Sequence, residues 1–189
     1  GESTAKIIAL GGGSSVITYS SGYDDAVRIT KDISDLKKRC SFIKMTVPDD
    51  IDGIPKMNQF NQVYYFPTPK IFGKRSLDYD IELYRSFFDI YVNSFKKVVE
   101  NLSKSPNPIS IYYPSTIAID YPINELSEYI NAKKEGEKLC EELNKIENIK
   151  IFYSRLPRTR TDQTMSFFEI PSENAEDVML PVIRDMSSL

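Results

Sequence analysis

Residues 109–113 read ISIYY, residues 125–144 read ELSEYINAKKEGEKLCEELN, and residues 149–153 read IKIFY. The two outer segments are short apolar runs rich in β-branched and aromatic residues, which is typical of buried strands. The middle segment is amphipathic, with one apolar helical face formed by Tyr129, Ala132, Gly136, Leu139 and Cys140. A strand, a helix and a second strand in this order indicate a parallel pair joined by a crossover helix.

The same alternation extends over the rest of the chain. Further strands are predicted at 16–19, 41–47 and 61–66, and further helices at 24–38, 80–102 and 174–186, the last with Asn174 as its cap. Five short strands separated by helices predict a doubly wound, Rossmann-like α/β fold with an open parallel sheet. The sequence has no internal repeat and no charged linker, so residues 1–189 are expected to form a single domain.

Composition narrows the possible functions. The net charge is −3, which gives no reason to expect nucleic acid or an anionic membrane as a partner. No apolar run reaches the roughly 18 residues needed to cross a bilayer, and no signal peptide opens the sequence. The two cysteines, Cys40 and Cys140, have no metal-like spacing, so we expect a reduced, cytoplasmic protein without a metal site.

The chain contains no histidine and 12 tyrosines. Without histidine, His-assisted nucleophiles, histidine general bases and His-ligated metals are excluded. Any proton transfer must therefore use tyrosine, lysine, serine or carboxylate groups.

Three residues form a candidate for such proton chemistry. Ser115 follows the strand 109–113, and ligand sites of open α/β sheets form at the carboxyl ends of strands. Tyr129 and Lys133 are one turn apart on the next helix and share a face. A lysine ammonium beside a phenol lowers the tyrosine pKa from its ordinary value of about 10. Such a tyrosine can donate a proton to a developing alkoxide, while a serine hydroxyl holds the same oxygen.

Together with residues 155–162, RLPRTRTD, these residues resemble the short-chain dehydrogenase/reductase family. In that family a strand followed by a proline-led loop ending in Thr-Asp passes beside the nicotinamide. The likeness extends over most of the chain, because the order and spacing of the strands also fit. It implies an oxidoreductase that reduces a carbonyl with NADP or NAD as cofactor, such as a 3-oxoacyl reductase domain of a larger synthase.

The resemblance also implies a role for each residue. Tyr129 would be the proton donor, Lys133 would bind the cofactor ribose and lower the tyrosine pKa, and Ser115 would hold the substrate carbonyl. The commoner family spacing is one residue shorter and would select Thr116 as this hydroxyl. The other cofactor contacts implied by the resemblance are Pro157, which leads the last loop, Thr161 near the cofactor amide, and Ser20, placed to accept a 2′-phosphate.

The first 19 residues allow two alignments with the family. In one, residues 6–10 are the first strand and the glycines 11–13 belong to the phosphate-binding turn. In the other, residues 4–10 are the tail of the first helix, the glycines are its exit, and 16–19 is the second strand. The second fits better, because the first leaves no room for a helix before residue 16. It implies a sheet that lacks its first strand and phosphate loop.

The sequence departs from the family elsewhere too. Phe66-Pro67-Thr68-Pro69 replaces the Asn-Ala-Gly motif, and the helix asparagine expected near Ile90 or Tyr91 has only Asn93 as a nearby candidate. Residues after 186 leave no room for the last strand, so the domain is expected to be incomplete at both ends. Another segment of a larger, multidomain polypeptide or a second copy in a homodimer would then cover the exposed sheet.

Two hypotheses follow. The first is a carbonyl reductase acting on a small-molecule or acyl-carrier-bound substrate. The second is a catalytically silent, reductase-like domain that scaffolds or dimerises a larger protein. The missing phosphate loop favours the second hypothesis, and the presence of Ser115, Tyr129 and Lys133 favours the first.

Overall fold

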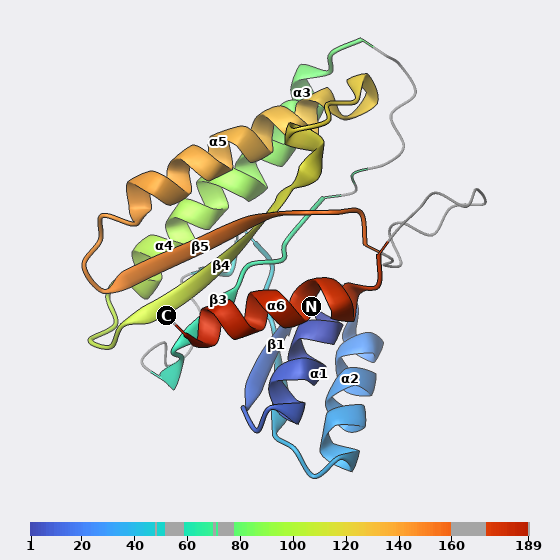
Figure 1. The fold of residues 1–189 in the computed structure, drawn as a ribbon, viewed down its shortest axis with the longest axis vertical. Coiled ribbons are helices and arrows are strands. Elements are labelled where there is room, and N and C mark those ends of the chain that lie inside the picture. The colour runs from blue at the N-terminus through green and yellow to red at the C-terminus, as the bar shows by residue number, and fades with distance from the viewer. Residues whose placement is uncertain (48, 52–58, 70, 72–77, 160–172, 189) are drawn as a thin grey trace, which may run out of the picture.

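The computed structural model describes residues 1–47, 49–51, 59–69, 71, 78–159 and 173–188. Helices and parallel strands alternate along the chain, which confirms the α/β fold class (Figure 1). The elements are α1 (Glu2–Leu10), β1 (Ser15–Tyr19), α2 (Tyr23–Asp35), β2 (Cys40–Lys44), β3 (Gln62–Tyr64), α3 (Ile81–Phe88), α4 (Phe95–Leu102), β4 (Ile109–Thr116), α5 (Ser127–Leu143), β5 (Ile149–Leu156) and α6 (Ala175–Ser187).

The strands form two sheets and not the single five-stranded sheet that the alternation predicts. One sheet has the order β1-β2 and the other the order β3-β4-β5, and every pairing is parallel. The break lies between β1 and β3, where no described strand joins the two halves. Since these strands would be neighbours of a missing first strand, the break is what the second alignment implies. Among the described residues no strand follows α6.

The beginning of the chain settles the choice between the two alignments. Residues 2–10 form α1, so a strand at 6–10 is wrong. The helix ends in a glycine turn in which the Gly13 amide donates to the Ile8 carbonyl at 2.9 Å. Gly12 has a φ of 90°, in the region that favours glycine. The three glycines therefore terminate a helix and do not form a phosphate-binding turn at its start.

The predicted helix over 80–102 is present but is not uniformly α-helical. Its start is capped by Asp80, whose carboxylate accepts from the amides of Glu82 and Leu83 at 3.0 and 3.1 Å. Between α3 and α4, residues Asp89–Ser94 form a π-helical segment. Such segments are rare and frequently mark functional sites. Here the segment contains Tyr91, whose side chain is buried.

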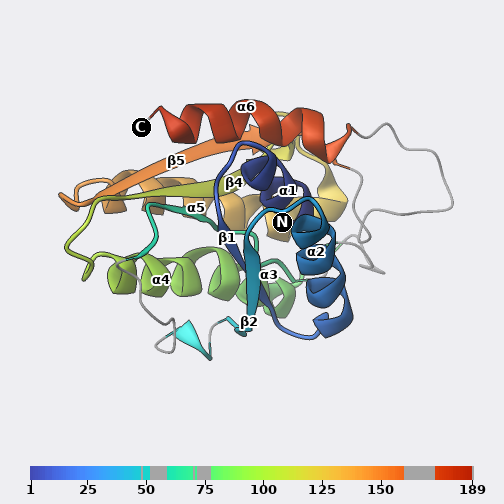
Figure 2. The same cartoon turned by 90° about the horizontal axis from the view of Figure 1, so that it is seen from below.

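Helices cover both faces of the larger sheet. Figure 2 shows α6 on one side of β4 and β5, and α4 and α5 on the other. The principal core packs the inner faces of α3–α5 against the sheet, and a smaller core packs Tyr112 against Met179, Val182 and Met186 of α6. Within the described ranges, no helix is both long and apolar enough to cross a bilayer.

Candidate functional site

The candidate site lies where β4 ends against α5. Thr116 is the last residue of β4, and Tyr129 and Lys133 lie one turn apart on α5. The Tyr129 ring meets the rings of Phe87 and Tyr91 edge-on, with centroids 5.7 and 5.8 Å apart. These aromatic contacts hold the tyrosine at the carboxyl end of the parallel strands, where an open sheet forms its ligand site.

The two candidate hydroxyls have different partners. The Thr116 side chain lies close enough to Tyr129 to act on the pKa of its phenol, and its hydroxyl oxygen accepts from the Ala118 amide at 3.3 Å. The Ser115 hydroxyl instead donates to a carboxylate oxygen of Glu137 at 2.5 Å. Both partners belong to α5, with Tyr129 near its start and Glu137 two turns further along. The structure therefore places Thr116 beside Tyr129 and Ser115 against Glu137.

Lys133 is buried, with 4% of its surface exposed. Its ammonium donates to the carbonyl of Pro114 at 2.6 Å and lies 3.8 Å from the centre of the Tyr91 ring and 4.7 Å from that of Tyr113. Such a position resembles a cation–π box closed by one carbonyl. Burial lowers the pKa of the lysine to about 7, because the charged form has lost its water.

Lys133 does not lower the pKa of Tyr129 in this arrangement. The lysine nitrogen lies 6.0 Å from the centre of the Tyr129 ring and is directed to the Pro114 carbonyl. Burial raises the pKa of Tyr129, and the neighbouring Thr116 side chain opposes this only in part. The lowering of the Tyr129 pKa that the one-turn spacing predicts is therefore not found. Two residues that share a helix face can still direct the ends of their side chains to different places.

Tyr91 is a site residue that the sequence reasoning did not select. It stands where the family resemblance places an asparagine, and its hydroxyl shares a 2.5 Å hydrogen bond with Thr68, which follows β3. Burial raises its pKa above the ordinary tyrosine range. The alternative candidate, Asn93, is exposed and donates to Asp89 at 3.2 Å, away from Lys133. The one sequence feature that could have identified Tyr91 as a site residue is that an aromatic residue stands where the family has an asparagine.

Two of the predicted cofactor contacts follow the carboxyl ends of strands. Ser20 follows β1, and its hydroxyl lies 3.2 Å from that of Thr46, which follows β2. Pro157 directly follows β5 and is half-buried. Thr161 lies outside the described residues.

The described residues do not build a place for a dinucleotide pyrophosphate. The start of α1 lines the cavity between the two sheets, and its first turn carries the carboxylate of Glu2. That carboxylate binds Arg28 at 3.0 and 2.9 Å and Lys6 at 2.7 Å, so the nearby cations are already paired. A phosphate at this end would face a carboxylate. The residues present fit the reacting end of a nicotinamide cofactor, at Thr116 and Tyr129, but not its phosphate end.

Glu137 links the site to β5 through an ion pair. It is nearly buried, and both its oxygens accept from Arg155, at 2.9 and 2.7 Å, in addition to the bond from Ser115. Burial alone would raise the pKa of Glu137, but the bonds from Arg155 and Ser115 outweigh it and lower the pKa. A carboxyl whose folded pKa is lowered stabilises the fold above its ordinary pKa and loses that contribution as the pH falls.

We expect Arg155→Met to lower the free energy of unfolding by about 2 kcal/mol at pH 7, since it strands a buried carboxylate whose partner is partly exposed. The loss should shrink as the pH falls toward 3, because Glu137 then begins to take up a proton and depends less on a cationic partner. Denaturant unfolding at both pH values measures it. Lys138→Met, which removes an exposed pair with Glu135, is the control and should change stability by less than about 0.5 kcal/mol. An equal loss at both pH values would contradict the assignment.

No protein-family model matches the sequence, and no curated protein is similar to it. Solved structures are similar in fold. FolM alternative dihydrofolate reductase 1 from Brucella canis, crystallised with NADP, superposes with a TM-score of 0.82 at 11% identity, over 98% of this chain and 82% of that one. A short-chain dehydrogenase from Burkholderia cenocepacia, also with NADP, has a TM-score of 0.78 at 15% identity, over 97% and 84%.

Acetoin dehydrogenase from Enterobacter cloacae has a TM-score of 0.75 at 15% identity, over 96% of this chain and 81% of that one. Such likeness at low identity shows the fold. The chain therefore has the Rossmann-like fold of the short-chain dehydrogenases, as the sequence resemblance implies. The neighbours do not test the roles of Ser115, Tyr129 and Lys133, which stay predictions.

Proposed function

We propose that this chain is the greater part of a carbonyl reductase that uses NADPH or NADH, with Tyr129 as the proton donor. The observation that carries the proposal is the closeness of the Thr116 side chain, at the carboxyl end of β4, to the phenol of Tyr129 on α5. The fold supports it, since proteins of this fold crystallise with NADP. The substrate class we favour is a small ketone or a 3-oxoacyl group on a carrier.

In this proposal, side chains of this protein donate the proton to the substrate oxygen and replace it. Burial keeps Tyr129 protonated at neutral pH, so its hydroxyl is available as an acid. In this proposal Thr116 hydrogen-bonds the same substrate oxygen, the role that the family spacing gives to this position. Lys133, with a pKa of about 7, can exchange a proton near neutral pH but must leave the Pro114 carbonyl to reach the phenolate. The described residues do not form a site for the cofactor's phosphates.

The second candidate is a catalytically silent structural domain. Its support is the burial of Lys133 among aromatic rings, together with Tyr91 in the place of the family's asparagine. In this case the lysine is a core residue and the tyrosines are packing groups.

Isothermal titration with NADPH and then NADH separates the two candidates, followed by turnover of a 3-oxoacyl thioester. We expect cofactor binding that is weaker than micromolar, because the described residues form no phosphate site, and that survives Tyr129→Phe, with turnover falling at least about 100-fold because the proton donor is lost. Thr116→Val should also lose turnover, whereas Ser115→Ala should not. Tyr153→Phe is the matched control, since its hydroxyl meets Glu141 and not the site. No binding at millimolar cofactor would favour the structural domain.

A further inference from the structure

The Lys133 ammonium is shared among groups from three elements. From β4, the Pro114 carbonyl accepts its hydrogen bond at 2.6 Å, and the centre of the Tyr113 ring lies 4.7 Å away. The π-helical segment supplies the nearest ring, that of Tyr91, whose centre is 3.8 Å from the ammonium nitrogen. The Tyr129 ring on α5, at 6.0 Å, lies at the outer limit of a cation–π contact. The shortest ring contact of the lysine is therefore with Tyr91 and not with Tyr129.

The Tyr91 ring is held more firmly than the lysine that contacts it. It is 1% exposed, and it stacks on the Phe87 ring with centroids 5.9 Å apart and planes within 4° of parallel. It meets the Tyr129 ring edge-on, and its hydroxyl shares a 2.5 Å hydrogen bond with Thr68. Lysine, by contrast, carries its charge on a flexible four-carbon stem. The ammonium therefore follows the ring, and the ring does not follow the ammonium.

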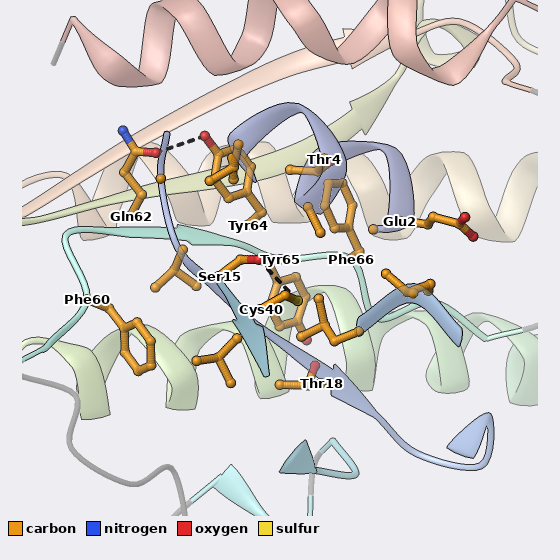
Figure 3. A pocket seen from close by; sticks show the side chains of 18 of the residues that line it. Glu2, Thr4, Ser15, Thr18, Cys40, Phe60, Gln62, Tyr64, Tyr65 and Phe66 are labelled. Carbon is orange, nitrogen blue, oxygen red and sulfur yellow. Dashed lines mark hydrogen bonds between the residues drawn. The ribbon is translucent and has the colours of Figure 1, made fainter. Parts of the chain in front are cut away.

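The backbone that carries Tyr91 is anchored as well. Tyr65 directly follows β3, and its side chain extends toward the helix that contains Ile90 (Figure 3). There its hydroxyl donates to the Ile90 carbonyl at 2.7 Å. Ile90 belongs to the π-helical segment and directly precedes Tyr91. Two hydroxyls that follow β3, those of Tyr65 and Thr68, thus fix the segment and its tyrosine, so the position of the ring is set without the lysine.

Among the described residues no carboxylate forms an ion pair with Lys133. Glu137, one turn further along α5, is the carboxylate that acts on it, but both Glu137 oxygens already accept from Arg155, and one of them also accepts from Ser115. Cys140 is the other titratable group of α5 that acts on the lysine. Burial raises the pKa of its thiol to about 12, so the thiol carries no charge at neutral pH. A carbonyl and the faces of aromatic rings are therefore what stabilise the ammonium.

We propose that Tyr91 is a positioning residue, whose ring holds the Lys133 ammonium beside the Pro114 carbonyl and away from Tyr129. A buried cation needs a partner, so without the ring it turns to the next group within reach. That group is Tyr129, one turn earlier on the same face of α5. The inference rests on the proposed function for its meaning in catalysis, because Tyr129 is the proton donor there. With the Tyr91 ring in place, the free protein keeps the lysine apart from this donor.

A series of fluorinated rings at position 91 tests whether the ring attracts the ammonium. Fluorine withdraws electron density from the face of a ring and changes its shape little. Tyr91→Phe, and then the same variant with one, two and three ring fluorines, therefore weakens a cation–π contact in steps. We expect the acid dissociation constant of the Lys133 ammonium to rise with each fluorine, by at least about threefold over the series. A constant that does not change along the series would overturn the proposal.

The dissociation constant is measured by NMR titration of protein labelled with carbon-13 at the lysine side chains. The Lys133 signal is assigned by its absence from Lys133→Met. Lys134, exposed on the same helix, is the internal control, and its signal should titrate identically in every member of the series. A structural role of the ring alone would not make the lysine follow the number of fluorines, because the packing is kept.

Removing the ring tests where the lysine then goes. Tyr91→Leu keeps an apolar side chain but has no ring face. We expect the acid dissociation constant of the Tyr129 phenol to rise at least about tenfold in this variant, because the ammonium moves toward the phenol and favours the phenolate. Tyr91→Phe keeps the ring and should show no such rise. NMR of carbon-13 tyrosine measures the phenol, with its signal assigned from Tyr129→Phe.

The double variant Tyr91→Leu with Lys133→Met separates positioning from packing. The rise should vanish in it, because the ammonium that causes the rise is gone. A rise that persists would come from water entering a looser core and would overturn the proposal, as would an unchanged Tyr129 in a folded Tyr91→Leu. If thermal melting shows that Tyr91→Leu does not fold, the fluorine series decides alone.

These measurements need neither cofactor nor substrate, so they are independent of turnover. The expected shifts in a protein that turns over no carbonyl substrate would leave the positioning role of Tyr91 standing and contradict the proposed function. Turnover that depends on Tyr129, without any of the expected shifts, would do the reverse.

Discussion

Replacing Gly136 by alanine will lower the free energy of unfolding by about 3 kcal/mol, although alanine is the better helix former by about 1 kcal/mol. A side-chain carbon on Gly136 would lie 1.9 Å from the hydroxyl oxygen of Tyr113 and 2.6 Å from the ring carbon that bears it. The Tyr113 ring is fully buried and packs on Phe95 and Tyr65 at centroid distances of 4.7 and 6.4 Å. It has no room to withdraw.

Chemical denaturation of Gly136→Ala, of Tyr113→Phe and of the double variant measures this clash. The Tyr113 hydroxyl is buried and has no hydrogen-bond partner among the described residues. Tyr113→Phe should therefore be neutral or stabilising. In the double variant it should recover part of the loss, because one of the two close contacts disappears. Lys134→Ala, exposed on the same helix, is the control. A stable Gly136→Ala would show that β4 and α5 are not packed this closely.

Replacing Lys133 by methionine will raise the free energy of unfolding at pH 7 by about 3–5 kcal/mol, since burial lowers the lysine pKa from 10.5 to about 7. Between these pH values the unfolded chain holds a proton that the folded chain has given up. Stability therefore rises with pH from about 7 to 10.5 and is lost as the pH falls. Methionine has a similar volume and no charge to desolvate, so the variant should lack this dependence.

Unfolding measured at several pH values from 6.5 to 9.5 tests this prediction. The difference between wild type and Lys133→Met should narrow as the pH rises, which isolates Lys133 from other titrating groups. Lys134→Met is the matched control and should show no narrowing, because Lys134 is exposed on the same helix. A constant difference would mean that Lys133 keeps its proton in the fold.

A difference in stability that narrows as the pH rises would also distinguish the two candidate functions. If Lys133 costs the fold several kcal/mol, a purely structural domain gains nothing by keeping it. A reductase, by contrast, can use a lysine that exchanges its proton near neutral pH. The stability measurement therefore complements the titration with NADPH, which tests cofactor binding directly.

The sequence by itself determined the elements, because their signals are local. Apolar periodicity placed the helices and strands, with the helix at 80–102 differing only in its π-helical segment. The glycines after residue 10 and the strand-like run at 16–19 were enough to infer that residues 4–10 are a helix and not a strand, as α1 confirms. The serine, tyrosine and lysine could be selected because their spacing is set by one strand and one helix.

Only the tertiary structure decided which of these groups meet. Ser115 and Thr116 are adjacent in sequence, yet Ser115 donates to Glu137 while Thr116 lies beside Tyr129. The position of the Lys133 ammonium depends on the Pro114 carbonyl and on the Tyr91 ring. Tyr91 is a buried residue of the π-helical segment. Pairing across elements depends on side-chain direction and on the surrounding dielectric, and neither is encoded in the spacing of residues along one segment.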